Sequence, residues 1–215
     1  MMKSRTLSPL HPRNMGVRMQ AHHVLSGEGV RQSGIGARLV KWRYDINTEK
    51  NLVFIPSTLQ GACYLGVQPH RGNHTAKGKA EVEATDDDYD DDAEPRDYHR
   101  TIARLIVNAS RDFPKSCKKR LDKINEVTEL MDALALLQME RIQNKPEEMP
   151  LTSVAQHFKR RSKVGCGGHD SVPILEGNPV HCDVGRNHNK KQKAGQRNEE
   201  IRYESNGKYQ LKMGQ

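Results

Sequence analysis

The acidic run between residues 81 and 94 limits the possible folds of this 215-residue chain more than any other feature. It holds nine Asp and Glu residues and no Lys or Arg. Carboxylates at this density repel one another and cannot be buried without cationic partners. We therefore expect a solvated, disordered insertion within a folded unit. Two other interpretations stay open: a segment that mimics nucleic-acid phosphates over a basic surface, and a cation-binding site.

The segments on either side of this run are basic. Residues 1–80 carry 12 basic and 3 acidic side chains, and residues 157–215 carry 12 and 6. A basic surface attracts polyanions such as nucleic acid, although an excess of Lys and Arg can also simply keep a chain soluble. With 34% hydrophobic and 5% aromatic residues, we expect a compact unit of roughly 100–140 residues. No apolar run reaches the length of a membrane helix, and the first residues contain no hydrophobic region typical of a Sec signal.

Hydrophobic periodicity predicts short strands followed by longer helices, which is an α+β pattern. The apolar stripe of residues 121–142 indicates packing, either under the core or in a helical pair with another chain. His11 and His157 have no neighbouring ligand-type residues, and we interpret them as surface residues. The predicted elements are a strand over 17–24 ended by residues 26–29, a short helix over 33–42 with Ser33 as its N-cap, a turn over 45–48, a strand over 51–55 stopped by Pro56, and helices over 97–113 and 116–144.

These elements suggest four regions. We expect a flexible lead-in over 1–15, a core over 16–113 that contains the acidic insertion 81–94, a helical extension over 114–150, and a basic tail with Cys and His over 151–215. The composition of this tail predicts poor order unless a metal or a partner orders it.

Four histidines and one asparagine carry the chemistry of the first half. His22 and His23 are adjacent on a predicted strand, so their side chains should point to opposite faces. His70 and His74 are spaced i, i+4 and could grip one ion from a helical turn. Asn51 lies between the two pairs and could hold a ring tautomer or complete a metal shell. An adjacent His pair alone is more often structural, but the whole set suits hydrolysis of a phosphodiester.

The motifs Ala21-His22-His23-Val24, Asn51 to Pro56, His70 to His74 and Tyr98-His99 stand in an order that resembles the AHH nucleases. That family is a branch of the HNH/endonuclease VII (His-Me finger, ββα-metal) superfamily, often found as the toxic C-terminal module of bacterial polymorphic toxins and type VI secretion effectors. The resemblance covers about residues 16–113. It departs from the family pattern at residues 75–97. These residues separate the His70–His74 segment, which corresponds to the finger of the family, from the helix that begins near Tyr98.

The resemblance implies a ββα-metal nuclease core and a role for each matching residue. His23 would be the general base, and His22, His70 and His74 would bind a divalent ion such as Mg2+, Mn2+ or Zn2+. Asn51 would orient His23 or support the metal. Tyr98 and His99 match helical positions after the finger, where a contact with phosphate or substrate is expected, so we include His99 among the catalytic candidates.

The resemblance also implies a biological setting. We expect a metal-dependent endonuclease that cleaves DNA or RNA and acts as an antibacterial toxin or secretion-system effector. Such a protein would be made in the cytoplasm, delivered into a target cell and neutralised by a cognate immunity protein. We expect it to bind no membrane. The sequence predicts no particular oligomeric state.

A second set of metal-ligand residues lies in the tail, at Cys166, His169, Cys182 and His188. Two thiolates and two imidazoles form a valid tetrahedral zinc set, although their spacing is not that of a standard finger. The alternative is that they are incidental residues of a basic tail. This set supports a second function class, a non-enzymatic zinc-dependent nucleic-acid-binding or regulatory protein. A third, a partner-binding helical protein with an acidic linker, requires neither metal nor DNA.

Overall fold

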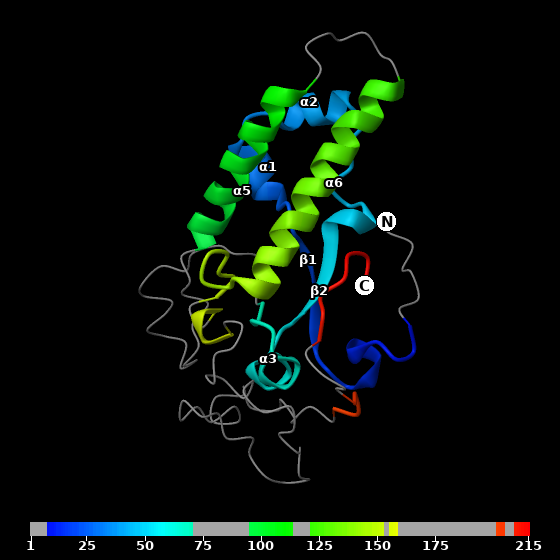
Figure 1. The fold of residues 1–215 in the computed structure, drawn as a ribbon, viewed down its shortest axis with the longest axis vertical. Helices are drawn as coiled ribbons and strands as arrows, with labels where there is room; N and C mark the ends of the chain where they lie inside the picture. The colour runs from blue at the N-terminus through cyan, green and yellow to red at the C-terminus, as the bar shows by residue number, and fades with distance from the viewer. Residues whose placement is uncertain (1–7, 71–94, 114–120, 153–154, 159–200, 205–208) are drawn as a thin grey trace.

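The protein is a mixed α+β structure with most of its described helices toward one end of a small antiparallel sheet and one short helix at the other end (Figure 1). The computed structural model describes residues 8–70, 95–113, 121–152, 155–158, 201–204 and 209–215. None of the helices in these ranges combines the length and the apolar character needed to cross a membrane. The α+β class expected from the sequence is therefore confirmed.

The sheet consists of β1 (Met19–His23) and β2 (Leu52–Pro56), which pair antiparallel with His22 opposite Val53. Backbone hydrogen bonds from Val24 N to Asn51 O and from Ser57 N to Arg18 O extend the pairing beyond both ends. Both strands match the predicted segments because alternating and β-branched residues suit a pleated surface that is at least half buried. The pairing brings the His-His sequence of β1 next to the start of β2.

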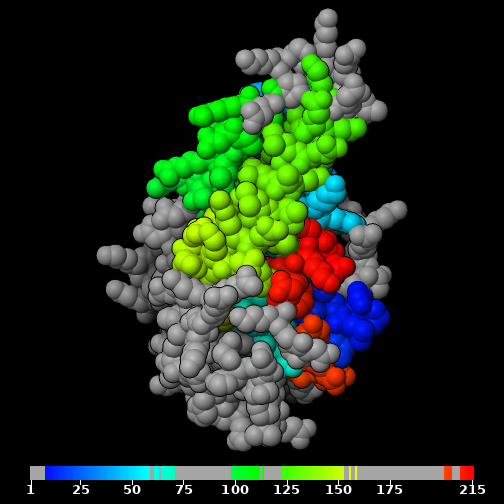
Figure 2. All heavy atoms as spheres, in the orientation of Figure 1, coloured from blue at the N-terminus to red at the C-terminus, as the bar shows by residue number. Residues whose placement is uncertain are grey.

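The other edge of β2 is covered by residues 209–215. Phe54 N donates to Gln215 O (3.0 Å) and Gly214 N donates to Leu52 O (2.7 Å). The Gln143 amide binds the same segment by donating to Tyr209 O (3.2 Å) and accepting from Leu211 N (2.7 Å). In Figure 2 this segment, in red, lies between the green helix and the blue N-terminal region. The polar composition of the tail predicts poor order here, but Leu211 is buried in the core and Tyr209 and Met213 pack against it.

Two short helices, α1 (Gly27–Gln32) and α2 (Gly36–Lys41), follow β1. Ser26 is the N-cap of α1, so the residues interpreted as a turn ending the strand in fact begin a helix. The prediction of one helix capped by Ser33 was wrong. Ser33 ends α1, and Gly34 adopts a left-handed conformation (φ +72°) that breaks the chain direction before α2.

Gly29 allows α1 to approach the long helix α5 (Pro95–Ala109) closely. A Cβ built on Gly29 would lie 2.6 Å from Ile102 Cγ2 and 2.9 Å from Ile102 Cβ. Because these atoms belong to a stiff β-branched side chain, a larger residue at position 29 would push the helices apart. Helix α3 (Leu59–Leu65), capped by Thr58 and ended by the left-handed Gly66, was not predicted because its glycine content obscured the pattern.

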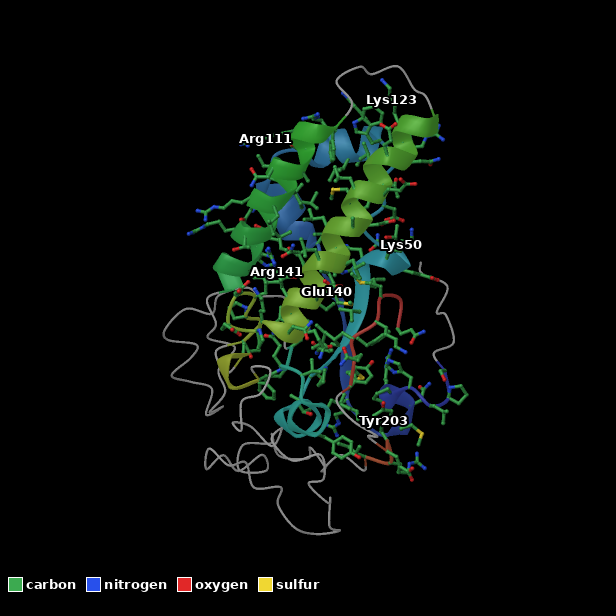
Figure 3. The ribbon with its side chains drawn as sticks, in the orientation of Figure 1. Lys50, Arg111, Lys123, Glu140, Arg141 and Tyr203 are labelled. Carbon is green, nitrogen blue, oxygen red and sulfur yellow. The ribbon has the colours of Figure 1, made fainter. Side chains whose placement is uncertain are left out.

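Helix α6 (Leu121–Asn144) packs beside α5 (Figure 1), and its apolar stripe contributes to the core, which was one of the two interpretations of that stripe. The salt bridge between Lys50 Nζ and Asp132 Oδ2 (3.0 Å) joins α6 to the 3-10 turn Glu49–Asn51 that precedes β2 (Figure 3 labels Lys50). Leu136 and Leu137, in contrast, stay exposed. The buried row of α6 consists of Val127, Met131, Ala135, Gln138, Met139 and Ile142.

His11 was expected to be a surface residue, but it is buried. It is 5% exposed, is the N-cap of the 3-10 helix Pro12–Met15, and its Nε2 lies 3.2 Å from the Tyr209 hydroxyl. Its ring also meets Phe54 edge-on. Its partner Tyr209 is far along the chain, so local sequence gave no sign of this burial. The end of the predicted lead-in is consequently a packed 3-10 turn. Two further 3-10 helices, Ser110–Asp112 and Ala155–Phe158, complete the described elements.

Candidate active site

His22 lies at the centre of a buried polar cluster on the inner side of β1. Only 3% of the residue is exposed. Its Nδ1 is 3.2 Å from His70 Nε2, and its Nε2 is 2.8 Å from the Tyr98 hydroxyl. Tyr98 also donates to Val24 O (2.6 Å). Three segments far apart in the sequence therefore meet at one imidazole.

His70 reaches this cluster from the loop that follows α3. Its backbone N–H donates to Pro56 O (2.8 Å), which ties the loop to the end of β2. Burial lowers the pKa of His70 from 6.5 to about 4, because a charged imidazole is poorly solvated there. The ring is thus neutral at neutral pH, and a neutral imidazole is the form that can act as a metal ligand.

The geometry of His22 and His70 suits a shared metal ion. Two nitrogens bound to one tetrahedral ion at 2.0–2.1 Å lie about 3.3 Å from each other. The observed separation of 3.2 Å between His22 Nδ1 and His70 Nε2 matches this value. The donor set is also appropriate, since imidazole binds borderline divalent ions well. These two residues therefore fit a divalent ion.

His23 points away from this cluster and is partly exposed. Its Nε2 is 3.0 Å from Asn47 Oδ1. The Asn47 Nδ2 group donates to Asp45 Oδ1 (3.1 Å), which accepts from Asn47 N as well (2.9 Å). Because the carboxylate takes the amide NH2 group, the amide oxygen faces His23, and His23 Nε2 must donate the hydrogen bond. The neutral ring then carries its lone pair on Nδ1, where it can accept a proton.

Asn51 is fully buried, and its side chain binds backbone atoms. Its Oδ1 accepts from Leu25 N (2.6 Å), and its Nδ2 donates to Leu25 O (3.0 Å) and Ile46 O (2.9 Å). The residue therefore fixes the loop after β1 against the loop before β2. The amide that contacts the His23 ring is that of Asn47 instead of Asn51.

His99 is buried on α5 next to Tyr98, and its Nδ1 lies 2.8 Å from Ser26 Oγ. Ser26 also accepts from Gly29 N (3.1 Å), so this contact joins α5 to the cap of α1. The Tyr98 hydroxyl was expected to contact phosphate or substrate. It is instead buried and bonded within the protein, and burial raises its pKa well above the ordinary value.

Several predicted ligands lie outside the described residues. They are His74, Cys166, His169, Cys182 and His188. Within the described ranges, no group of three or more His, Cys, Asp or Glu side chains gathers in a way that could hold a metal ion. The structure thus brings together two of the three predicted ligands, His22 and His70, and leaves the third untested.

Sequence reasoning missed two residues that contact the candidate histidines, Asn47 and Ser26. Each lies in a local sequence motif that was recognised but interpreted differently. Asn47 belongs to the predicted turn of residues 45–48, where Asp and Asn side chains commonly bond nearby backbone. Ser26 precedes a glycine-rich stretch and was interpreted as the end of a strand, although serine is also a favoured N-cap.

Comparison with known proteins agrees with this arrangement. The model of AHH, described as a nuclease family of the HNH/ENDO VII superfamily with conserved AHH, matches residues 6–145, nearly two thirds of the chain. The motif Ala21-His22-His23 stands within that range. Neither a curated protein nor a solved structure matches the chain.

The match defines a nuclease of the HNH/ENDO VII superfamily, whose members generally use divalent metal ions and act on nucleic acid. Within that superfamily, the chain belongs to the AHH family.

Proposed function

We propose that this protein is a metal-dependent endonuclease that hydrolyses phosphodiester bonds of DNA, with RNA as the other candidate substrate. His23 is the general base, and His22, His70 and His74 hold the divalent ion. One observation carries the proposal: His22 Nδ1 and His70 Nε2, 48 residues apart, meet at 3.2 Å inside the range matched by a nuclease family.

Each residue contributes a defined step. A bound divalent ion would stabilise the charge that develops on the phosphate and on the leaving oxygen. His23 Nδ1 accepts a proton from the attacking water, while Nε2–H keeps its hydrogen bond to Asn47. The Asp45 carboxylate holds Asn47 in place by accepting hydrogen bonds from its backbone N–H and from its side-chain NH2 group. Asn51 fixes the loops on either side of these groups, so its role is to position the base indirectly.

The exposed face of α5 supports a nucleic-acid substrate. Arg100 and Arg104 are exposed on this helix, whose buried face carries Tyr98, and Arg111 is exposed in the 3-10 helix Ser110–Asp112 that follows it (Figure 3 labels Arg111). Guanidinium groups bind phosphates, and such contacts are largely independent of base sequence. Because α5 carries both Tyr98, which contacts His22, and two of these exposed arginines, phosphates bound by the arginines would lie near the candidate site.

The biological role follows from the resemblance to bacterial toxin modules. The protein would act as an antibacterial toxin or effector, delivered by a secretion system such as type VI and neutralised by a cognate immunity protein. Expression inside bacterial cells tests this role. Growth arrest by the wild-type protein that is relieved by His23→Ala would support it, and unaffected growth with soluble wild-type protein would contradict it.

Plasmid cleavage tests the biochemical proposal directly. Purified protein is incubated with supercoiled DNA and with RNA, in Mg2+, Mn2+, Zn2+ or EDTA. We expect metal-dependent cleavage that EDTA abolishes and that His23→Ala reduces by at least ~100-fold. His11→Ala is the matched control, because it removes a buried histidine outside the proposed site and should retain cleavage. Binding of DNA without cleavage under any metal would instead favour the non-enzymatic zinc-dependent protein.

A further inference from the structure

The Tyr98 hydroxyl joins β1 to α5 through two hydrogen bonds. It lies 2.6 Å from Val24 O and 2.8 Å from His22 Nε2, and all three residues are buried. The Tyr98 and His22 rings are 5.4 Å apart between centroids. The tyrosine hydroxyl can donate one hydrogen bond through its single proton and can accept hydrogen bonds through the lone pairs of its oxygen.

The distribution of that proton determines the state of His22. A carbonyl oxygen can only accept, so Tyr98 must donate its single proton to Val24 O. The contact with His22 Nε2 is then a hydrogen bond only if Nε2 carries a proton and donates to the tyrosine oxygen. In the neutral ring this leaves the lone pair on Nδ1, the nitrogen that faces His70 Nε2 at 3.2 Å.

We propose that Tyr98 is the positioning residue that selects the Nε2–H tautomer of His22 and thereby makes Nδ1 its metal-binding atom. This inference rests on the proposed function and extends it by naming the ligand atoms, Nδ1 of His22 and Nε2 of His70. Partners that hold the second nitrogen of a ligating histidine fix the ring and increase its affinity for metal. Tyr98 would therefore act on the metal through His22 and contact neither metal nor substrate.

The tautomer can be measured in the metal-free wild-type protein. Long-range proton–nitrogen NMR correlations on 15N-histidine-labelled protein, recorded near pH 8 to keep histidines neutral, distinguish a protonated nitrogen from an unprotonated one. His22→Gln assigns the resonances. We expect His22 to be protonated on Nε2 and unprotonated on Nδ1. The opposite tautomer in the wild-type protein would overturn the inference without any variant.

Substitution tests the role of the hydroxyl. Tyr98→Phe keeps the ring and removes both hydrogen bonds, so the Nδ1–H tautomer of His22 should gain population. The affinity for Zn2+, measured by titration calorimetry, should fall ~10- to 100-fold. Tyr209→Phe is the matched control, because Tyr209 also bonds a histidine Nε2, that of His11, at 3.2 Å. It should lose stability but keep the His22 tautomer and the Zn2+ affinity.

The outcomes separate this inference from the proposed function. If Tyr98→Phe binds Zn2+ as tightly as the wild-type protein, the role of Tyr98 is refuted while the nuclease proposal stands. If the Tyr209→Phe control loses affinity equally, the effect is general destabilisation, which also refutes it. If the folded wild-type protein binds neither Zn2+, Mn2+ nor Mg2+, the proposed function and the ligand assignment fail together.

Discussion

Asn51→Ala should destabilise the protein strongly, because the buried amide joins two loops by three hydrogen bonds. These bonds bind the N–H and C=O of Leu25 and the C=O of Ile46 at 2.6–3.0 Å. Each contributes about 0.5–1.5 kcal/mol, and a buried backbone group left without its partner costs about 1–3 kcal/mol. Since water can partly replace the missing amide, we expect a loss of about 2–4 kcal/mol in the free energy of unfolding.

Urea unfolding followed by circular dichroism measures this loss, and thermal unfolding should show a decrease of roughly 10 °C in Tm for a chain of this size. Asn47→Ala is the control, since Asn47 is an exposed asparagine in the same stretch and its removal should change stability by less than about 0.5 kcal/mol. An Asn51→Ala protein as stable as wild type would refute the assignment of Asn51 as the clamp between the loops.

Four further predictions follow from the described contacts. In the cleavage assay, Asn47→Ala should lose about 10-fold in rate with little change in stability; a rate equal to that of the wild-type protein would contradict the role of this amide. Gly29→Ala should cost about 1–3 kcal/mol in urea unfolding because its Cβ would collide with α5, whereas Gly36→Ala, whose nearest contact is 3.4 Å, should be tolerated. For the metal-free protein, the pKa of His70 is about 4 when folded and 6.5 when unfolded, so stability is full above pH 6.5 and should fall by about 3 kcal/mol towards pH 4; a flat profile across that window would show that His70 is not buried in solution. If the tail holds structural zinc, elemental analysis should find one more zinc per chain in the wild-type protein than in Cys166→Ser, and equal zinc contents would leave the tail set incidental.

The local elements of this fold were largely predictable because their signals lie within a few residues. Alternation placed His22 and His23 on opposite sides of a strand, and the structure buries the first and partly exposes the second. The apolar repeats of α5 and α6 likewise gave two long helices. The break between α1 and α2 was missed because a left-handed Gly34 interrupts a sequence that otherwise has helical character.

The partners of the candidate histidines were harder to predict because they depend on three-dimensional proximity. The contact of His22 with Tyr98 spans 76 residues, and no periodic pattern encodes it. Asn51 was expected next to His23 because the family order puts an asparagine between the two histidine pairs. The register of β1 and β2 instead sends its side chain to the backbone of Leu25, and the nearby turn supplies Asn47.

The position of residues 209–215 on β2 affects the time course of folding during synthesis. β1 precedes β2 and can pair with it as soon as both have left the ribosome. Residue 215, which accepts from Phe54 N, is made roughly 160 residues later. At a synthesis rate of roughly 5–20 residues per second, the outer edge of β2 stays without this partner for about 8–32 s. During that interval its backbone groups can pair with another strand, so this edge of the nascent chain is open to aggregation or to a chaperone.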